Sequence, residues 1–425
     1  MFSLSEMVEN GRIKEVTEDM GNNMIFPKTF ILGNGETSMK IEKMTIDNIN
    51  GIKHLDLIFN KELNLICGEN GVGKTTILKA IAHYFIHGND SFIKKYYGTE
   101  KGVVDIKLID TDSYLQYEVT DFVPGYLERY SPQFRESDQL IYFPSSRTIN
   151  YLKLDSLPTS KNVHTDNNSL HSSKLLILGV DKDIKSWFVN RLIFSKLDDS
   201  LTDTQINNLI TCRKVFSLLD KRLCVKTAKP DFEIILKDHD KEIYFEMLSD
   251  GYKSCIFILL GIIKEVEYRF PEINAVDFDS IIMIDEIDIH LHPQWQSKLV
   301  NVLKQVFPKA QIIATTHSPS VLQNATAEEI IPLYKDENDD VQIKELHLGE
   351  YGLQGWTLEE IMKDVMGMES TTSDLYAQTI KEFDEAMYEE DVPLIKEKYK
   401  TLCKMLHPQS TLRQLLKIQM AGLEE

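Results

Sequence analysis

The chain has 425 residues, 42% of them hydrophobic and 27% charged, with a formal net charge of −19. This length can bury at least one large core. The longest apolar run, CIFILLGIIK at 255–264, is too short for a membrane-spanning helix, which needs roughly 18 to 20 residues. Because the whole molecule repels nucleic acid, contact with DNA or RNA needs a local basic patch or a partner.

Five cysteines are scattered without a C-x-x-C pair, and the first residues lack the layout of a signal peptide. We therefore expect a cytoplasmic protein with no membrane association, no disulfides and no structural zinc.

Along the chain, residues 1–38 show no sustained hydrophobic period and are expected to be an N-terminal extension. From Met39 an alternating pattern with Asn-Gly breaks predicts a β-meander that leads into a strand at 63–67. A helix is expected from about Lys74 to His87. Further strands are predicted within 101–123 and at 140–148.

The second half begins with a helical pattern at about 165–230. Segment 280–325 then alternates strand and helix, which is typical of a parallel sheet covered by helices. A last hairpin is expected near 333–346, and the pattern is helical from 355 onward.

The strongest functional signal is a phosphate-binding motif, GENGVGKT at 68–75, which matches G-x-x-x-x-G-K-[ST] at each fixed position. Its glycines let backbone N–H groups surround phosphates, its lysine supplies a cation, and its threonine ligates Mg²⁺. The sequence therefore predicts ATP and Mg²⁺ as cofactors. The expected nucleotide-binding residues are Gly68, Asn70, Gly71, Gly73, Lys74, Thr75 and Thr76, with Lys74 also catalytic.

Two carboxylates end the apolar strand IIMIDE at 281–286. Buried carboxylates are costly unless a cation lies nearby, and a Mg²⁺ held by Thr75 provides one. We expect Asp285 to be a metal ligand and Glu286 to be the general base. His317 ends a second strand, AQIIATTHS, where it is expected to contact the γ-phosphate.

A weaker stretch, LSDGYKS at 248–254, stands just before an apolar helix. With the phosphate loop before it and the acidic strand and histidine after it, the chain resembles an ABC-type ATPase head. The resemblance implies that Ser249 and Gly251 face a γ-phosphate held by a second subunit, so that a homodimer, or a higher homo-oligomer, forms through an ATP sandwich. Asp250 and Tyr252 replace the glycine and glutamine usual in transporters.

Three segments, at 39–59, 285–296 and 315–322, resemble the SMC-like and overcoming-lysogenization-defect branch of these ATPases. The implied fold is α/β: an ABC-type head (β-meander plus parallel sheet with helices) over 39–350, interrupted by a helical insertion at about 165–230. A helical C-terminal region over 351–425 follows. FPSSR at 143–147 stands where a Mg²⁺-coordinating glutamine loop is expected, and Arg147 is a candidate phosphate contact.

The helical tail is similar to that of the PtuA ATPases of bacterial Septu and retron-associated anti-phage systems. This resemblance implies a partner HNH nuclease (PtuB-like), gated or scaffolded by the chain, acting on DNA or a retron nucleic acid. A basic segment at 213–229 fits a nucleic-acid contact, with an amphipathic helix that has a solvated basic face as the alternative. Two alternatives remain: a DNA repair ATPase of the recombination-mediator type, and a slowly hydrolysing nucleotide-dependent clamp.

Overall fold

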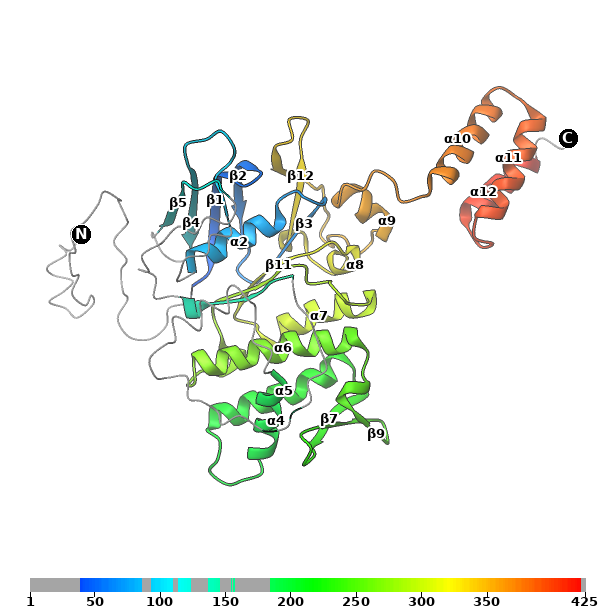
Figure 1. The fold of residues 1–425 in the computed structure, drawn as a ribbon. Coiled ribbons are helices and arrows are strands. Elements are labelled where there is room, and N and C mark those ends of the chain that lie inside the picture. Colours follow the sequence, from blue (N-terminus) through cyan, green and yellow to red (C-terminus); the bar gives the residue numbers. More distant parts are fainter. Residues whose placement is uncertain are drawn as a thin grey trace.

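The computed structural model describes residues 39–85, 93–109, 114–123, 137–145, 154, 156 and 184–421. Within these residues, two sheets and a helical lobe form one head, and a group of three helices lies beside it (Figure 1). The extension predicted at 1–38 and the first part of the predicted helical insertion lie outside the described residues.

The first sheet is antiparallel, with the strand order β2-β1-β4-β5. Its strands alternate buried apolar and exposed polar residues, which covers one face and leaves the other to solvent. Its strands are β1 (Ile41–Ile49), β2 (Ile52–Ile58), β4 (Gly102–Leu108) and β5 (Tyr114–Val119).

The second sheet has the order β13-β12-β3-β11-β10-β6 and is parallel except for its edge strand β13. Its central strands are buried on both faces, as a parallel sheet between two layers requires. The strands are β3 (Leu63–Gly68), β6 (Leu140–Phe143), β10 (Ile281–Ile284), β11 (Gln311–Thr315), β12 (Ile330–Lys335) and β13 (Val341–Ile343). The predicted meander is thus a β1–β2 hairpin, and β3 crosses into the parallel sheet.

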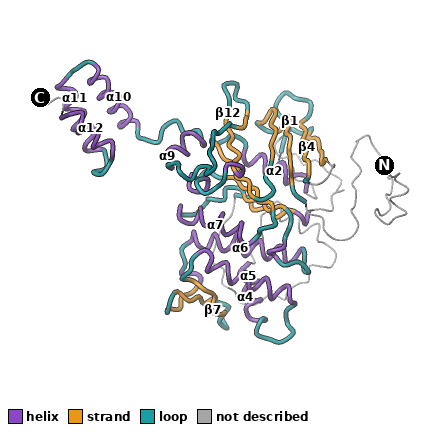
Figure 2. The backbone as a smooth tube through the Cα atoms, turned by 180° about the vertical axis from the view of Figure 1, so that it is seen from behind, coloured by secondary structure: helices purple, strands orange, loops and turns teal. Residues whose placement is uncertain are grey.

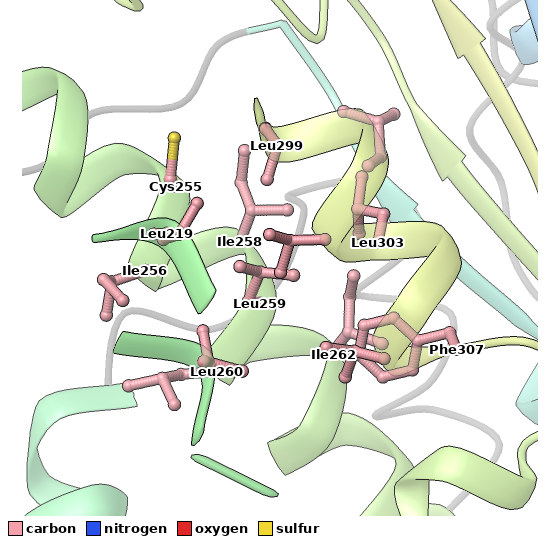
Figure 3. Close-up of a cluster of buried hydrophobic side chains, with 14 of the residues drawn as sticks. Leu219, Cys255, Ile256, Ile258, Leu259, Leu260, Ile262, Leu299, Leu303 and Phe307 are labelled. Carbon is pink, nitrogen blue, oxygen red and sulfur yellow. The ribbon is translucent and has the colours of Figure 1, made fainter. Parts of the chain in front are cut away.

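Helix α2 (Lys74–Phe85) packs between the two sheets, in one core with apolar residues of β1, β2 and β4. The other face of the parallel sheet carries a helical lobe with a second core (Figure 3). The lobe contains α4 (Ile184–Phe194), α5 (Asp203–Leu219), α6 (Asp250–Arg269) and α7 (Pro293–Val306). Figure 3 shows Ile258, Leu259 and Ile262 of α6 against Leu299 and Leu303 of α7.

The helical pattern predicted up to about residue 230 is wrong at its end, because α5 stops at Leu219 and a small sheet follows. Leu223 and Val225 alternate with the exposed Cys224, so this segment buries one face as a strand. The small sheet consists of β7 (Leu223–Ala228), β8 (Ile234–Asp238) and β9 (Lys241–Tyr244).

After β11, the chain forms α8 (Pro319–Leu322), the β12–β13 hairpin, and then α9 (Leu358–Glu360), which continues into a π-helix over Ile361–Val365. Three more helices form a separate group, which Figure 2 shows standing off from the head. They are α10 (Asp374–Tyr388), α11 (Val392–Met405) and α12 (Thr411–Ala421), and they enclose a small apolar core of their own. No helix in the described part of the chain is long and apolar enough to cross a membrane.

Candidate nucleotide site

The candidate site lies at the carboxyl ends of three neighbouring parallel strands. β11 pairs with β3 on one side and with β10 on the other. The phosphate loop after β3, the carboxylates after β10 and His317 after β11 therefore meet at one edge of the sheet, where ligands of open α/β sheets bind.

Three glycines give the phosphate loop its shape: Gly68, Gly71 and Gly73 have φ values of 133°, 77° and 104°, a region that side chains rarely adopt. At Gly68 a β-carbon would also lie 2.0 Å from the carbonyl oxygen of Leu333 on β12. The loop thus turns tightly and leads into α2, whose first backbone N–H groups have no partner within the helix. Such a loop fits the phosphates of a nucleotide.

Lys74 lies inside this loop. Its Nζ donates hydrogen bonds to the carbonyl oxygens of Gly68, at 2.9 Å, and Glu69, at 2.7 Å. Burial lowers the pKa of the amine. A buried cation that donates hydrogen bonds to two neutral carbonyls is suited to an anionic ligand, which would compensate its charge better than those carbonyls do.

Thr75 and Asp285 come together as the sequence predicts: the Thr75 hydroxyl lies 3.1 and 3.2 Å from the two oxygens of the Asp285 carboxylate. Asp285 is buried, and its backbone N–H donates to the carbonyl of Phe143 at 2.8 Å. A hydroxyl and a carboxylate at this separation are the oxygen ligands that Mg²⁺ prefers. Arg147, the other expected contact in this region, lies outside the described residues.

Thr315 connects the two carboxylate positions, and sequence reasoning missed it. Its hydroxyl donates to Asp285 Oδ1 at 2.7 Å and accepts the backbone N–H of Glu286, also at 2.7 Å. Glu286 has φ of 49°, a left-handed conformation that costs free energy and needs such support. The only signal in the sequence was a hydroxyl at the end of an apolar strand.

His317 is fixed through its backbone. Asp288 Oδ1 accepts the His317 N–H at 3.1 Å and the Thr316 hydroxyl at 2.6 Å. Burial, and then the nearby charge of Lys74, lower the pKa of the His317 ring. The imidazole is therefore neutral near pH 7, with nitrogens available as donor and acceptor.

Asn70 and Thr76 complete the predicted set around the loop. Asn70 is exposed at the loop's turn. The Thr76 hydroxyl, on the first turn of α2, lies 3.5 Å from the side-chain nitrogen of Asn50 in the β1–β2 turn.

Ser249 and Gly251 lie elsewhere. Ser249 is the N-cap of α6 and accepts the Tyr252 N–H at 3.4 Å. α6 packs on the face of the parallel sheet opposite to α2. The side chain of Asp250 is 92% exposed and pairs with Lys253 at 2.8 Å. Tyr252 is buried, so the residue at the glutamine position points inward.

The basic segment at 213–229 runs through the end of α5, a turn and β7, so it is not one helix. Several of its cations have nearby partners: Arg222 pairs with Asp220, and Lys226 pairs with Glu242.

The fold and the site define an SMC-like ATPase of the ABC type. Residues 156–323 match the family described as "AAA domain, putative AbiEii toxin, Type IV TA system", and residues 43–215 match a second AAA domain family. Among solved structures, the SMC head domain from Thermotoga maritima aligns with a TM-score of 0.38 and 15% identity, covering 73% of this chain and 100% of that one.

The relatives narrow the class. The chain is 42% identical to the Septu protein PtuA of Bacillus thuringiensis over 394 residues. The matched region covers 90% of this chain and 98% of that protein. It is also 37% identical over 102 residues to the retron Vc95 probable ATPase of Vibrio cholerae, covering 24% of this chain and 20% of that one. The chain therefore belongs to the PtuA family of Septu ATPases.

Proposed function

We propose that this ATPase binds Mg²⁺-ATP between two copies of the chain, and that its nucleotide state gates a partner HNH nuclease in anti-phage defence. The observation that carries the catalytic part is the hydrogen-bonded series from Thr75 through Asp285 and Thr315 to Glu286. It holds a metal-binding pair and a general-base candidate at fixed positions beside the phosphate loop.

Each residue of the site has a distinct role in this proposal. Lys74 exchanges its two carbonyl partners for phosphate oxygens, and Thr75 with Asp285 holds Mg²⁺, whose positive charge offsets the negative charge of the phosphates. Glu286 accepts a proton from the attacking water. His317, neutral at its backbone anchor on Asp288, donates a hydrogen bond toward the terminal phosphate.

The dimeric part of the proposal rests on α6. Ser249 and Gly251 stand at the N-terminus of a 20-residue helix, whose dipole and free N–H groups favour an anion. Their place across the parallel sheet from α2 suits a phosphate bound by another subunit. The exposed carboxylate of Asp250 adds a negative charge at this end of the helix, which its pairing with Lys253 at 2.8 Å partly offsets.

The gating of a nuclease is supported by kinship with the Septu PtuA protein. The test is co-purification of the chain with the product of the neighbouring gene, followed by DNA cleavage assays with and without ATP. Glu286→Gln should bind ATP, hydrolyse it at least 100-fold more slowly and change the cleavage by the pair. Glu337→Gln, on the exposed β12–β13 turn, is the matched control and should behave like the wild type.

A partner nuclease whose cutting is the same for wild type and Glu286→Gln, with and without nucleotide, refutes the gating. If the lone chain binds DNA in an ATP-dependent way and purifies with no partner, a role in DNA repair replaces the proposal.

A further inference from the structure

We propose that Trp295 is a positioning residue that couples the two ATP sites of the dimer, by seating the N-terminal end of α6 on the loop that carries the general base. This inference rests on the proposed ATP sandwich. The first turn of α7 would then transmit changes between three segments that it contacts: the N-terminus of α6, the loop 286–292 and the loop after β11.

The first contact is with Gly251. A β-carbon at Gly251 would lie 3.3 Å from Trp295 Cδ1, 3.5 Å from the His290 carbonyl oxygen and 3.5 Å from the His292 nitrogen. The backbone of α6 at this point therefore rests directly on the indole and on the main chain of the loop that begins with Glu286. Even a methyl group at this position would press on the edge of the indole, so the glycine lets the two elements pack closely.

Tyr252, the residue after Gly251, contacts the same indole with its ring. The ring of Tyr252 meets Trp295 edge to face, with centroids 5.1 Å apart and an interplanar angle of 80°. Its hydroxyl donates to the carbonyl oxygen of Phe216 on α5 at 2.8 Å. This explains why a tyrosine at the glutamine position points inward: its task is to fix α6 on Trp295, since edge-to-face aromatic pairs add stability beyond burial.

Trp295 is itself fastened to the catalytic loop. Its backbone N–H donates to the carbonyl oxygen of His292, the N-cap of α7, at 2.7 Å, and the Nζ of Lys298 lies 4.8 Å from the indole centroid. His290, in the same loop, has φ of 63°, so the loop is held in a conformation that the surroundings must support.

Gln296, the residue after Trp295, contacts both the loop after β10 and the loop that contains His317. The Gln296 side-chain nitrogen donates to the Leu291 carbonyl at 3.0 Å and lies 3.4 Å from that of Asp288. Its oxygen accepts the hydroxyl hydrogen of Ser318 at 2.5 Å, one residue after His317. Trp295 and Gln296 thus join the N-terminus of α6 to both loops that follow the catalytic strands.

These contacts have a functional consequence in the dimer. When α6 engages the nucleotide of the partner subunit, its displacement is passed through Trp295 to the loop of Glu286, which serves the nucleotide of its own subunit. Hydrolysis is then positively cooperative in ATP, and the coupling is lost when the indole is removed. The phosphate loop does not take part in these contacts, so nucleotide binding itself stays intact.

The test compares Trp295→Ala with Trp295→Phe and Glu337→Gln in the full chain. For Trp295→Ala we expect a Hill coefficient for ATP hydrolysis near 1, a kcat lowered on the order of tenfold, and an ATP dissociation constant within about twofold of the wild type. Trp295→Phe keeps an aromatic ring against Tyr252 and should restore most of the Hill coefficient. A purely structural role predicts instead that ATP binding and kcat fall together with the melting temperature.

A separate measurement distinguishes this inference from the proposed sandwich. Glu286→Gln with ATP should dimerise in light scattering, and a failure to do so overturns the sandwich and the inference with it. If Glu286→Gln dimerises but Trp295→Ala keeps the wild-type Hill coefficient and kcat, the sandwich stands and the coupling role of Trp295 is refuted.

Discussion

The hydroxyl of Thr315 offers the sharpest test of how the site is built. Thr315→Val keeps the shape of the side chain and removes only the group that joins Asp285 to Glu286. Thr315 is fully buried, so water cannot replace the lost partner. The backbone N–H of Glu286 loses the hydrogen bond that it donates to the Thr315 hydroxyl, at a cost of about 1 to 3 kcal/mol. The lost hydrogen bond to the Asp285 carboxylate adds a similar amount.

Asp285 keeps its contact with Thr75, which reduces the second cost. We therefore expect the free energy of unfolding to fall by about 2 to 4 kcal/mol. The left-handed conformation of Glu286 also loses its support, so kcat should fall on the order of 10- to 100-fold while ATP binding is largely kept.

Urea unfolding followed by circular dichroism measures the first effect, and a steady-state ATPase assay measures the second. Thr315→Ser is the matched control, because it keeps the hydroxyl and loses only a methyl group. It should cost about 1 kcal/mol and retain most activity. A valine variant that is as stable and as active as the serine variant would show that the hydroxyl does not hold the carboxylate positions.

Three further outcomes are expected. In a histidine NMR titration, Lys74→Met should raise the pKa of His317, because it removes the lysine charge that, after burial, lowers this pKa; an unchanged titration would contradict this. Gly68→Ala should abolish nucleotide binding in a fluorescent-ATP assay, since its φ of 133° and the nearby β12 carbonyl exclude a β-carbon. Glu267→Ala should lower the free energy of unfolding by about 3 to 5 kcal/mol, because it leaves the buried Arg191 without its carboxylate. The melting temperature should therefore fall strongly, and a small shift would refute that cost.

The sequence was sufficient for features written in short, contiguous stretches. The phosphate loop, the buried strand before Asp285 and the alternation of the first sheet each depend on local spacing, and the structure places Lys74, Thr75 and Asp285 together at one edge. Their roles in catalysis stay predictions.

Other features depend on which strands become neighbours. Thr315 and Asp288 gain their importance only because β11 inserts between β3 and β10, and no pattern along the chain reveals that order. The inward orientation of Tyr252 depends in the same way on Trp295, which is more than forty positions further along. β7 was missed because its short alternating run follows directly on a true helix, where both periods are compatible with the same few residues.

The three C-terminal helices bear on how such a protein can diversify. Their apolar core, which includes Phe383, Leu402 and Leu416, is formed within the group. Replacing the three helices with another segment would therefore expose no part of the core of the head. The segment that leads to them nevertheless passes close to the phosphate loop: a β-carbon at Gly367 would lie 2.3 Å from the carboxylate oxygen of Glu69. A change confined to these three helices would therefore leave both cores of the head in place, although it would begin close to the phosphate loop.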